Sequence, residues 1–118
     1  MLPDQINYGD FRQLVGFLEG EGCFWLGSNG AVGIEFTTTD MDVAESMAKL
    51  MGIEPSLSKS TNPLSKKLSY RARLFGDPAI VWMKALWPFL GRRRQDKILT
   101  ILEYRSKHGR GHAQRTES

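Results

Sequence analysis

Residues 14–22 of the chain read LVGFLEGEG, and the apolar residues among them recur at the spacing of one helix face. Two glycines nevertheless lie inside the predicted helix and a third follows it. Each interior glycine costs roughly 0.5–1 kcal/mol relative to alanine. Gly16 and Gly20 are four residues apart, so they share one face. Two acids, Glu19 and Glu21, stand beside these glycines. A helix that contains two interior glycines needs a favourable contact elsewhere to offset the stability that the glycines cost.

The predicted helix has a start signal and an end signal. Asp10 is suited to cap the N-terminus, because the apolar stripe begins directly after it. Gly22 is expected to end the helix in the left-handed conformation that glycine adopts readily. We therefore expect a helix over residues 10–21.

The next segment predicts a β-hairpin. Aromatic and β-branched residues flank Ser28-Asn29-Gly30, and Asn-Gly between two such runs is a strong signal for a tight turn. Strands are expected over residues 22–27 and 31–38. In the second strand one face is apolar (Val32, Ile34, Phe36), and the other carries Ala31, Gly33, Glu35 and Thr37.

A helix and two strands follow. Asp40 predicts the cap of a helix that runs to Met51, with Gly52 ending it. Residues 55–60 fit a short edge strand. From residue 67 to 75 polar and apolar residues alternate, which gives one face of Leu68, Tyr70, Ala72 and Leu74 and another of Lys67, Ser69, Arg71 and Arg73.

Two helices complete the pattern. Asp77-Pro78 predicts the start of a helix to about Leu86, and Pro88 ends or kinks it. A last helix is expected from residue 91 to 104. The order α-β-β-α-β-β-α-α indicates an α+β fold, one antiparallel sheet with helices on one face. We expect a single domain over residues 1–107 and a polar, flexible tail over 108–118.

Composition narrows the class of protein. The chain has 118 residues and one cysteine, which excludes an internal disulfide and fits an intracellular, reducing location. No signal peptide or membrane span is visible. Residues 1–58 hold two basic and nine acidic residues, whereas residues 59–118 hold fourteen basic and four acidic ones. This asymmetry favours a polyanionic partner such as nucleic acid.

The segment LVGFLEGEG resembles the motif that names the LAGLIDADG homing endonucleases. Cys23-Phe24 continues the motif, and the order α-β-β-α-β-β-α is that of the family core. Trp87-Pro88-Phe89-Leu90, followed by basic residues and a helix, resembles a C-terminal landmark of the family. The resemblance spans roughly residues 8–105.

The resemblance offers an explanation for the glycines. In the family, two motif helices pack side by side, and small residues allow their backbones to approach closely. Since this chain has one motif, the resemblance implies a two-fold homodimer. Its expected interface consists of Leu14, Gly16, Phe17 and Gly20.

The resemblance also implies roles for the two acids, Glu19 and Glu21. The resemblance implies that Glu21 is the metal-binding acid of the active site, with the Gly20 carbonyl as a further ligand, although the family often has Asp there. Two carboxylates close together require a cation, and oxygen ligands suit Mg²⁺ or Mn²⁺. Glu19 is expected either to be structural or to support the metal ligands without contacting the metal.

Two further catalytic positions are carried over from the family. Arg93 matches a basic residue near the scissile phosphate, with Arg92 and Arg94 as close alternatives that could also anchor phosphate. Thr38 falls closest to a polar residue, commonly Gln, that positions water. Arginine does not easily exchange protons, so a lysine-like role is not carried over.

The polar sheet face is the expected DNA-binding surface, because a β-platform with arginines can read the major groove. Glu35 shares that face, and the sequence leaves open whether it accepts from cytosine or pairs with Arg71. The expected DNA-binding residues are Lys59, Lys67, Ser69, Arg71, Arg73, Arg92 and Arg94.

The resemblance thus implies a homodimeric, site-specific endonuclease that hydrolyses double-stranded DNA with Mg²⁺. The alternative is a catalytically weak or inactive nucleic-acid-binding protein on the same scaffold, either an intron RNA maturase or a DNA-binding regulator, because the family's Gln and Lys are absent. A plain dimerisation module is the third possibility.

Overall fold

The computed structural model describes residues 2–59 and 68–108, and its first α-helix begins earlier than predicted. After a short 3₁₀ turn, η1 (Pro3–Gln5), helix α1 spans Tyr8–Glu21. The cap is Asn7, whose Oδ1 accepts the Asp10 backbone N–H at 2.7 Å, while its Nδ2 donates to Asp10 Oδ2 at 3.0 Å. The predicted cap at Asp10 is therefore wrong, because Asp10 lies in the first turn, where a negative charge complements the helix dipole.

Gly22 ends α1 in a different way from the prediction. Its φ of −82° and ψ of 157° are extended, so the helix runs directly into strand β1 (Gly22–Leu26) without a left-handed residue. Glycine is needed at this position because any larger residue would clash with the preceding turn of α1. A Cβ at this position would lie 2.6 Å from the Leu18 carbonyl oxygen.

The predicted hairpin is confirmed. Strand β2 (Val32–Thr38) pairs antiparallel with β1, from Leu26 opposite Val32 to Gly22 opposite Phe36. In the connection, Gly27 N–H donates to the Ala31 carbonyl at 2.7 Å, and Asn29 Oδ1 accepts the Ala31 N–H at 3.0 Å. Gly30 has a φ of 89°, which suits glycine at this turn position.

The middle of the chain follows the prediction closely. Asp40 caps α2 (Met41–Met51) by accepting the Val43 N–H at 3.2 Å, and Gly52 ends that helix with a φ of 74°. Strands β3 (Ser56–Lys59) and β4 (Leu68–Phe75) follow. The four strands are antiparallel in the order β1-β2-β4-β3, so β1 and β3 are the edges.

The C-terminal helices begin and end differently from the prediction. Helix α3 spans Gly76–Leu86, and Asp77 lies in its first turn instead of capping it. After the 3₁₀ turn η2 (Trp87–Phe89), helix α4 spans Arg92–His108, so it is longer than predicted and includes the first residue of the predicted tail.

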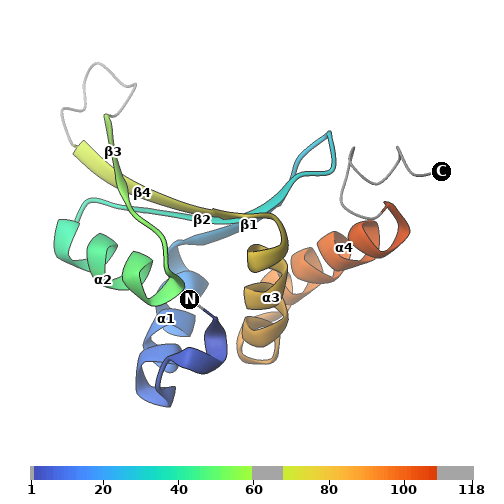
Figure 1. Cartoon of the computed structure of the whole chain (residues 1–118), viewed down its shortest axis with the longest axis horizontal. Coiled ribbons are helices and arrows are strands. Elements are labelled where there is room, and N and C mark those ends of the chain that lie inside the picture. The colour runs from blue at the N-terminus through green and yellow to red at the C-terminus, as the bar shows by residue number, and fades with distance from the viewer. Residues whose placement is uncertain (1, 60–67, 109–118) are drawn as a thin grey trace.

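The architecture is α+β, with the four helices of the described residues on one side of the sheet (Figure 1). The core lies between these layers, and its largest fully buried side chain is Trp82. The predicted apolar faces supply most of the sheet side of this core, with Val32, Ile34, Phe36, Ala72 and Leu74 buried. Phe24 of β1 adds to it, whereas Leu68 at the start of β4 is 44% exposed. Among the described residues, no helix combines the length and apolar character needed to cross a membrane.

Candidate functional site

Glu21 is the last residue of α1 and stands at one end of the sheet. The next residue, Gly22, pairs with Phe36 near the end of β2. The Glu21 side chain is exposed and makes no hydrogen bond or ion pair with the described part of the chain. A carboxylate at a helix C-terminus opposes the helix dipole, so this position is unfavourable without a bound cation.

The residues on either side of Glu21 are tied to the start of α4. The Glu19 carboxylate accepts the Gly91 N–H through Oε1 and pairs with Arg94 Nε through Oε2 at 3.1 Å. Arg94 Nε also donates to the Glu19 carbonyl at 2.8 Å, and its Nη1 donates to the Gly22 carbonyl at 2.7 Å. These contacts join segments more than seventy residues apart in sequence and agree with a structural role for Glu19.

This connection, the Glu19–Arg94 clamp, brings the arginine cluster to the end of the molecule that carries Glu21. The Arg94 side chain is 13% exposed, whereas Arg92 and Arg93 are exposed. Three cations in the first turn of a helix are unfavourable with respect to its dipole. The carbonyls of Glu19 and Gly22 compensate Arg94, but no protein group of the described residues does so for Arg92 or Arg93.

Thr38 lies at the same end of the sheet, two residues beyond the pair formed by Phe36 and Gly22. Its hydroxyl accepts the Asp40 N–H at 3.2 Å and so supports the start of α2. It falls on the helix side of β2 by alternation with Phe36, whereas the exposed neighbour Thr37 belongs to the open face. Positioning a water molecule, the role predicted for Thr38, would therefore compete with the hydrogen bond from the Asp40 N–H to the Thr38 hydroxyl.

A metal ion would find part of a coordination shell here. The described residues hold no group of three or more His, Cys, Asp or Glu side chains that could bind a metal by themselves. Gly20 is exposed, and the Glu21 carboxylate is free and negatively charged. Carboxylate and carbonyl oxygens are the ligands that Mg²⁺ and Mn²⁺ prefer, but one carboxylate and one carbonyl are too few to form a metal site by themselves.

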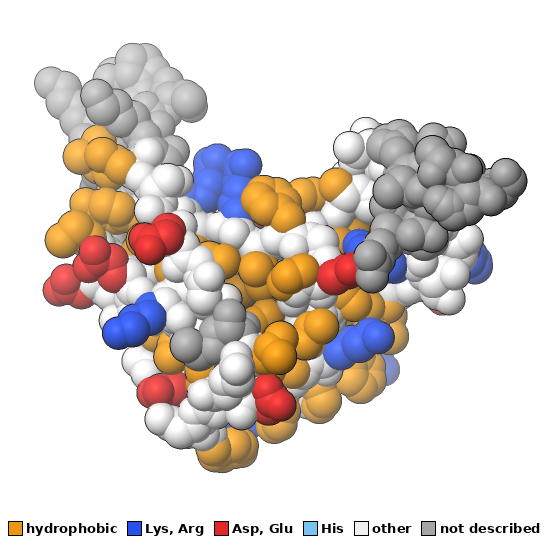
Figure 2. Space-filling model, in the orientation of Figure 1, with side chains coloured by type: hydrophobic (Ala, Val, Ile, Leu, Met, Phe, Trp, Pro, Cys, Tyr) orange, Lys and Arg blue, Asp and Glu red, His pale blue; other side chains and the backbone are white. Residues whose placement is uncertain are grey.

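The open face of the sheet carries a row of paired charges. Arg73 Nε lies 2.8 Å from Glu35 Oε1, and Arg71 Nε lies 3.5 Å from Glu35 Oε2. Glu35 therefore pairs with both arginines, which is one of the two roles that the sequence left open; accepting from cytosine stays a prediction. Ser69 follows on the same face by alternation; the Lys59 side chain and Lys67 lie outside what the structure describes. In Figure 2, Lys or Arg side chains and hydrophobic side chains stand next to each other on the upper side of the molecule, which the helices leave open.

Two aromatic residues on this face were missed in the sequence. Trp25 of β1 and Phe75 of β4 lie on either side of Gly33 in β2, and their ring centroids are 5.7 Å apart at an angle of 73°. The hairpin register could have revealed Trp25, because a turn centred on Asn29 places it opposite Gly33.

The glycine face of α1 is open, as a helix interface requires. A Cβ added at Gly16 or Gly20 would meet no described atom within 4 Å. Phe17 is half-buried, with its ring 4.9 Å from that of Phe36 in an edge-to-face contact. Leu14, predicted at the interface, is 0% exposed in the core, so it has no surface to offer to a second chain.

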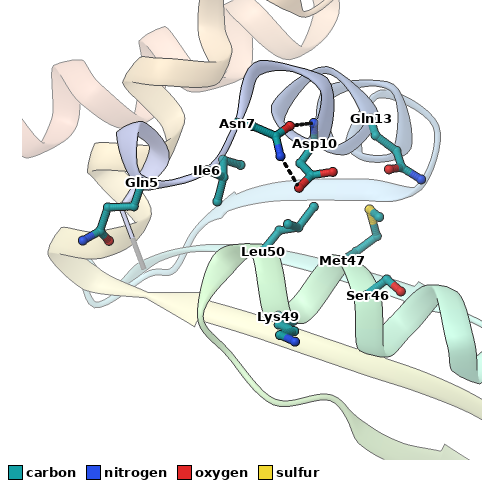
Figure 3. Close-up of a pocket in the computed structure, with 9 residues that line it drawn as sticks. All are labelled: Gln5, Ile6, Asn7, Asp10, Gln13, Ser46, Met47, Lys49 and Leu50. Atoms are coloured by element: carbon teal, nitrogen blue, oxygen red, sulfur yellow. Dashed lines mark hydrogen bonds between the residues drawn. The ribbon is translucent and has the colours of Figure 1, made fainter.

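A separate hollow of about 510 Å³ lies between the start of α1 and α2 (Figure 3). Its single carboxylate, Asp10, is bound to Asn7, and its other polar groups are mainly amides. Apolar side chains of Ile6, Met47 and Leu50 also line it. Of the described residues that line the hollow, Lys49 is the single cation. The hollow lies at the start of α1, whereas Glu21 and the arginine cluster lie at the other end of that helix, so we do not place the functional site there.

Comparisons with protein-family models, with curated proteins and with solved structures find no match for this chain. The resemblance to the LAGLIDADG family therefore rests on the residues of the chain itself.

Proposed function

We propose that the chain is one subunit of a homodimeric, Mg²⁺-dependent endonuclease that cleaves double-stranded DNA, as the resemblance to LAGLIDADG homing endonucleases implies. The observation that carries the proposal is the free Glu21 carboxylate at the joint between α1 and β1, held in place by the Glu19–Arg94 clamp. This arrangement costs helix stability and has no evident purpose within a single chain.

The second subunit would complete the site. Gly16 and Gly20 leave an uncovered strip along α1, and a second α1 could pack against this strip at close range. The two copies of Glu21 would then stand near the two-fold axis. One carboxylate per chain becomes two per dimer, so each of the two DNA strands would face one Glu21.

Each part of the site has a chemical task. Glu21 and the Gly20 carbonyl would hold Mg²⁺, which supplies Lewis acidity when bound. Arg93 is exposed beside the clamp, where its guanidinium can bind a phosphate and stabilise negative charge. Arg94 donates through Nε and Nη1 to the backbone carbonyls of Glu19 and Gly22, so we assign it to holding Glu21 in place; its predicted phosphate contact stays a prediction.

The open sheet face would bind the DNA. Arg71 and Arg73 are 38% and 44% exposed, and Glu35 holds their guanidinium groups on the outer side of the sheet. An arginine fork of this kind can read guanine in the major groove. Since two cations share one anion, the row keeps a net positive charge toward the phosphates.

A second candidate is a binder without nuclease activity, either an intron RNA maturase or a DNA-binding regulator. The specific observation in its favour is that the Thr38 hydroxyl already accepts the Asp40 N–H and that Arg94 is held by the clamp. Fewer groups are then free for moving a proton or orienting water.

The test is incubation of the protein with a library of double-stranded targets and Mg²⁺, followed by sequencing of the ends. Wild type should produce site-specific nicks or cuts that EDTA abolishes. Glu21→Gln should lower the rate about a hundredfold or more, because the charge that holds the metal is lost. Glu45→Gln removes an exposed acid of α2 and serves as the matched control. Intact DNA with wild type, or equal cutting by Glu21→Gln, would reject the proposal, and tight binding without cleavage would favour the second candidate.

A further inference from the structure

The open face of the sheet contains an aromatic row that the proposed cleavage chemistry does not use. Trp25, Gly33 and Phe75 are directly opposite one another across β1, β2 and β4. Residues opposite each other in antiparallel strands point to the same side of the sheet. The residues that neighbour these three along the strands are buried in the core: Phe24, Ile34 and Leu74. By alternation, the row therefore lies on the other side of the sheet. All four described helices are on the core side (Figure 1).

Gly33 allows the Trp25 ring to lie across the sheet. A Cβ at residue 33 would be 2.5 Å from Trp25 Cζ2 and 2.7 Å from Cε2, so the ring fills the space that a side chain would occupy. The indole nitrogen Nε1 is buried and has no hydrogen-bond partner among the described residues. What Trp25 offers to the outside is therefore its carbon framework.

Phe75 raises the exposed apolar area of this row. It is 51% exposed, which is unusual for a large aromatic side chain that has a partner ring 5.7 Å away. The row of Glu35 and Arg73 is the next one along the strands, a step of two residues or roughly 7 Å. An apolar platform thus lies directly beside fixed guanidinium groups.

We propose that the exposed Phe75 ring, with the Trp25 ring packed edge-to-face beside it, stacks one unpaired base of DNA that is bound on the sheet. This inference rests on the proposed DNA binding and names the kind of DNA the site prefers. Paired bases present only their edges in a groove, because their flat faces are hidden in the helical stack. An exposed aromatic platform suits a base that has left the stack, and arginines beside it suit the adjoining phosphates and paired bases.

The occupant is assigned to DNA because of the neighbouring arginines. Arg71 and Arg73 project from a sheet, and a two-stranded β-ribbon fits the major groove of B-form DNA. The major groove of an RNA helix is deep and narrow, and side chains cannot read it. A DNA duplex with one unpaired base can place that base on the aromatic row and its paired bases and phosphates beside the arginines.

The test compares the binding of two fluorescein-labelled DNA pools by anisotropy without metal. One is a random-sequence duplex, and the other is the same duplex with one central unpaired adenine. Wild type should bind the bulged pool about tenfold more tightly, which is within the range for stacking of one base. Phe75→Leu should abolish this ratio, and Phe75→Tyr should keep it. Phe89→Leu changes an aromatic residue of similar exposure on the helix side and should also keep the ratio.

The outcomes separate this inference from the proposed function. Equal binding of both pools by wild type, or an unchanged ratio in folded Phe75→Leu, overturns the stacking role and leaves the nuclease proposal standing. Tighter binding to a single RNA strand of the same sequence than to the bulged duplex overturns the assignment to DNA. No binding of either pool at low salt rejects the proposed function together with the inference.

Discussion

At the scale of single residues, Arg94 links the acidic and basic halves of the chain. Its guanidinium contacts the carbonyls of Glu19 and Gly22, and therefore fixes the backbone on both sides of Glu21. Hydrogen bonds from a charged donor are stronger than those between neutral groups. The same contacts satisfy carbonyls at the end of α1 that the helix itself leaves without partners.

We expect Arg94→Ala to lower the free energy of unfolding by about 2 kcal/mol, since charged hydrogen bonds of a largely buried side chain are lost. Arg92→Ala, an exposed position in the same turn, should change it by less than about 0.5 kcal/mol. Urea unfolding followed by circular dichroism measures both. Equal stabilities of the two variants would contradict the clamp.

Gly33 gives a second prediction at this scale. Gly33→Ala should cost about 1–3 kcal/mol, because the new methyl group would overlap the Trp25 ring. Gly16→Ala serves as the contrast, since its Cβ meets no described atom and alanine favours a helix. The comparison is made by thermal unfolding at a protein concentration low enough to keep the chain monomeric. A destabilisation of Gly16→Ala as large as that of Gly33→Ala would show that the Trp25 contact is not the cause.

At the scale of elements, the boundaries are set by caps and close contacts. Asn7 and Asp10 are both good capping residues three positions apart, and the structure selects Asn7, with Asp10 as the residue that reaches back to it. The helix can then extend through Gly9 in spite of that residue's poor propensity.

Asn7→Ala should lower the free energy of unfolding by about 1 kcal/mol, the usual effect of removing an N-cap. Asp4→Ala alters an exposed acid just before the helix and should have little effect. Melting temperatures read by circular dichroism decide between the two caps. If Asn7→Ala melts like wild type, Asp10 caps the helix in solution.

The strands and most of the core could be predicted from the sequence, because the pattern that identifies them lies within a few consecutive residues. Alternation between Val32, Ile34 and Phe36 and their polar neighbours reports directly which face is buried. The Glu19–Arg94 clamp could not be predicted, because it joins residues seventy-five positions apart and no local pattern encodes it. The extended conformation of Gly22 was missed for a similar reason: whether a helix runs directly into a strand depends on how the strand pairs.

At the scale of the whole molecule, one chain leaves two surfaces uncovered, the glycine strip of α1 and the open face of the sheet. The proposed function assigns the first to a second copy of the chain and the second to DNA. Both meet at Glu21, which is why the proposed function requires the dimer.

Gly16→Leu should therefore prevent dimer formation without unfolding the chain, because the added side chain points into open space within one subunit. Lys84→Leu adds the same apolar side chain on the exposed side of α3 and should leave the dimer intact. Sedimentation velocity reads the mass of each variant. A dimer that persists in Gly16→Leu would mean that the subunits meet through another surface.

The most direct test of the central claim, that two α1 helices meet and bring two Glu21 residues together, uses Cys23. This residue is exposed, is the single cysteine of the chain, and follows Glu21 by two positions. A spin label attached to it in each subunit should give one narrow distance by pulsed electron paramagnetic resonance, well below the 48 Å length of one subunit. Absence of dipolar coupling, or a separation as long as a subunit or longer, would contradict the account.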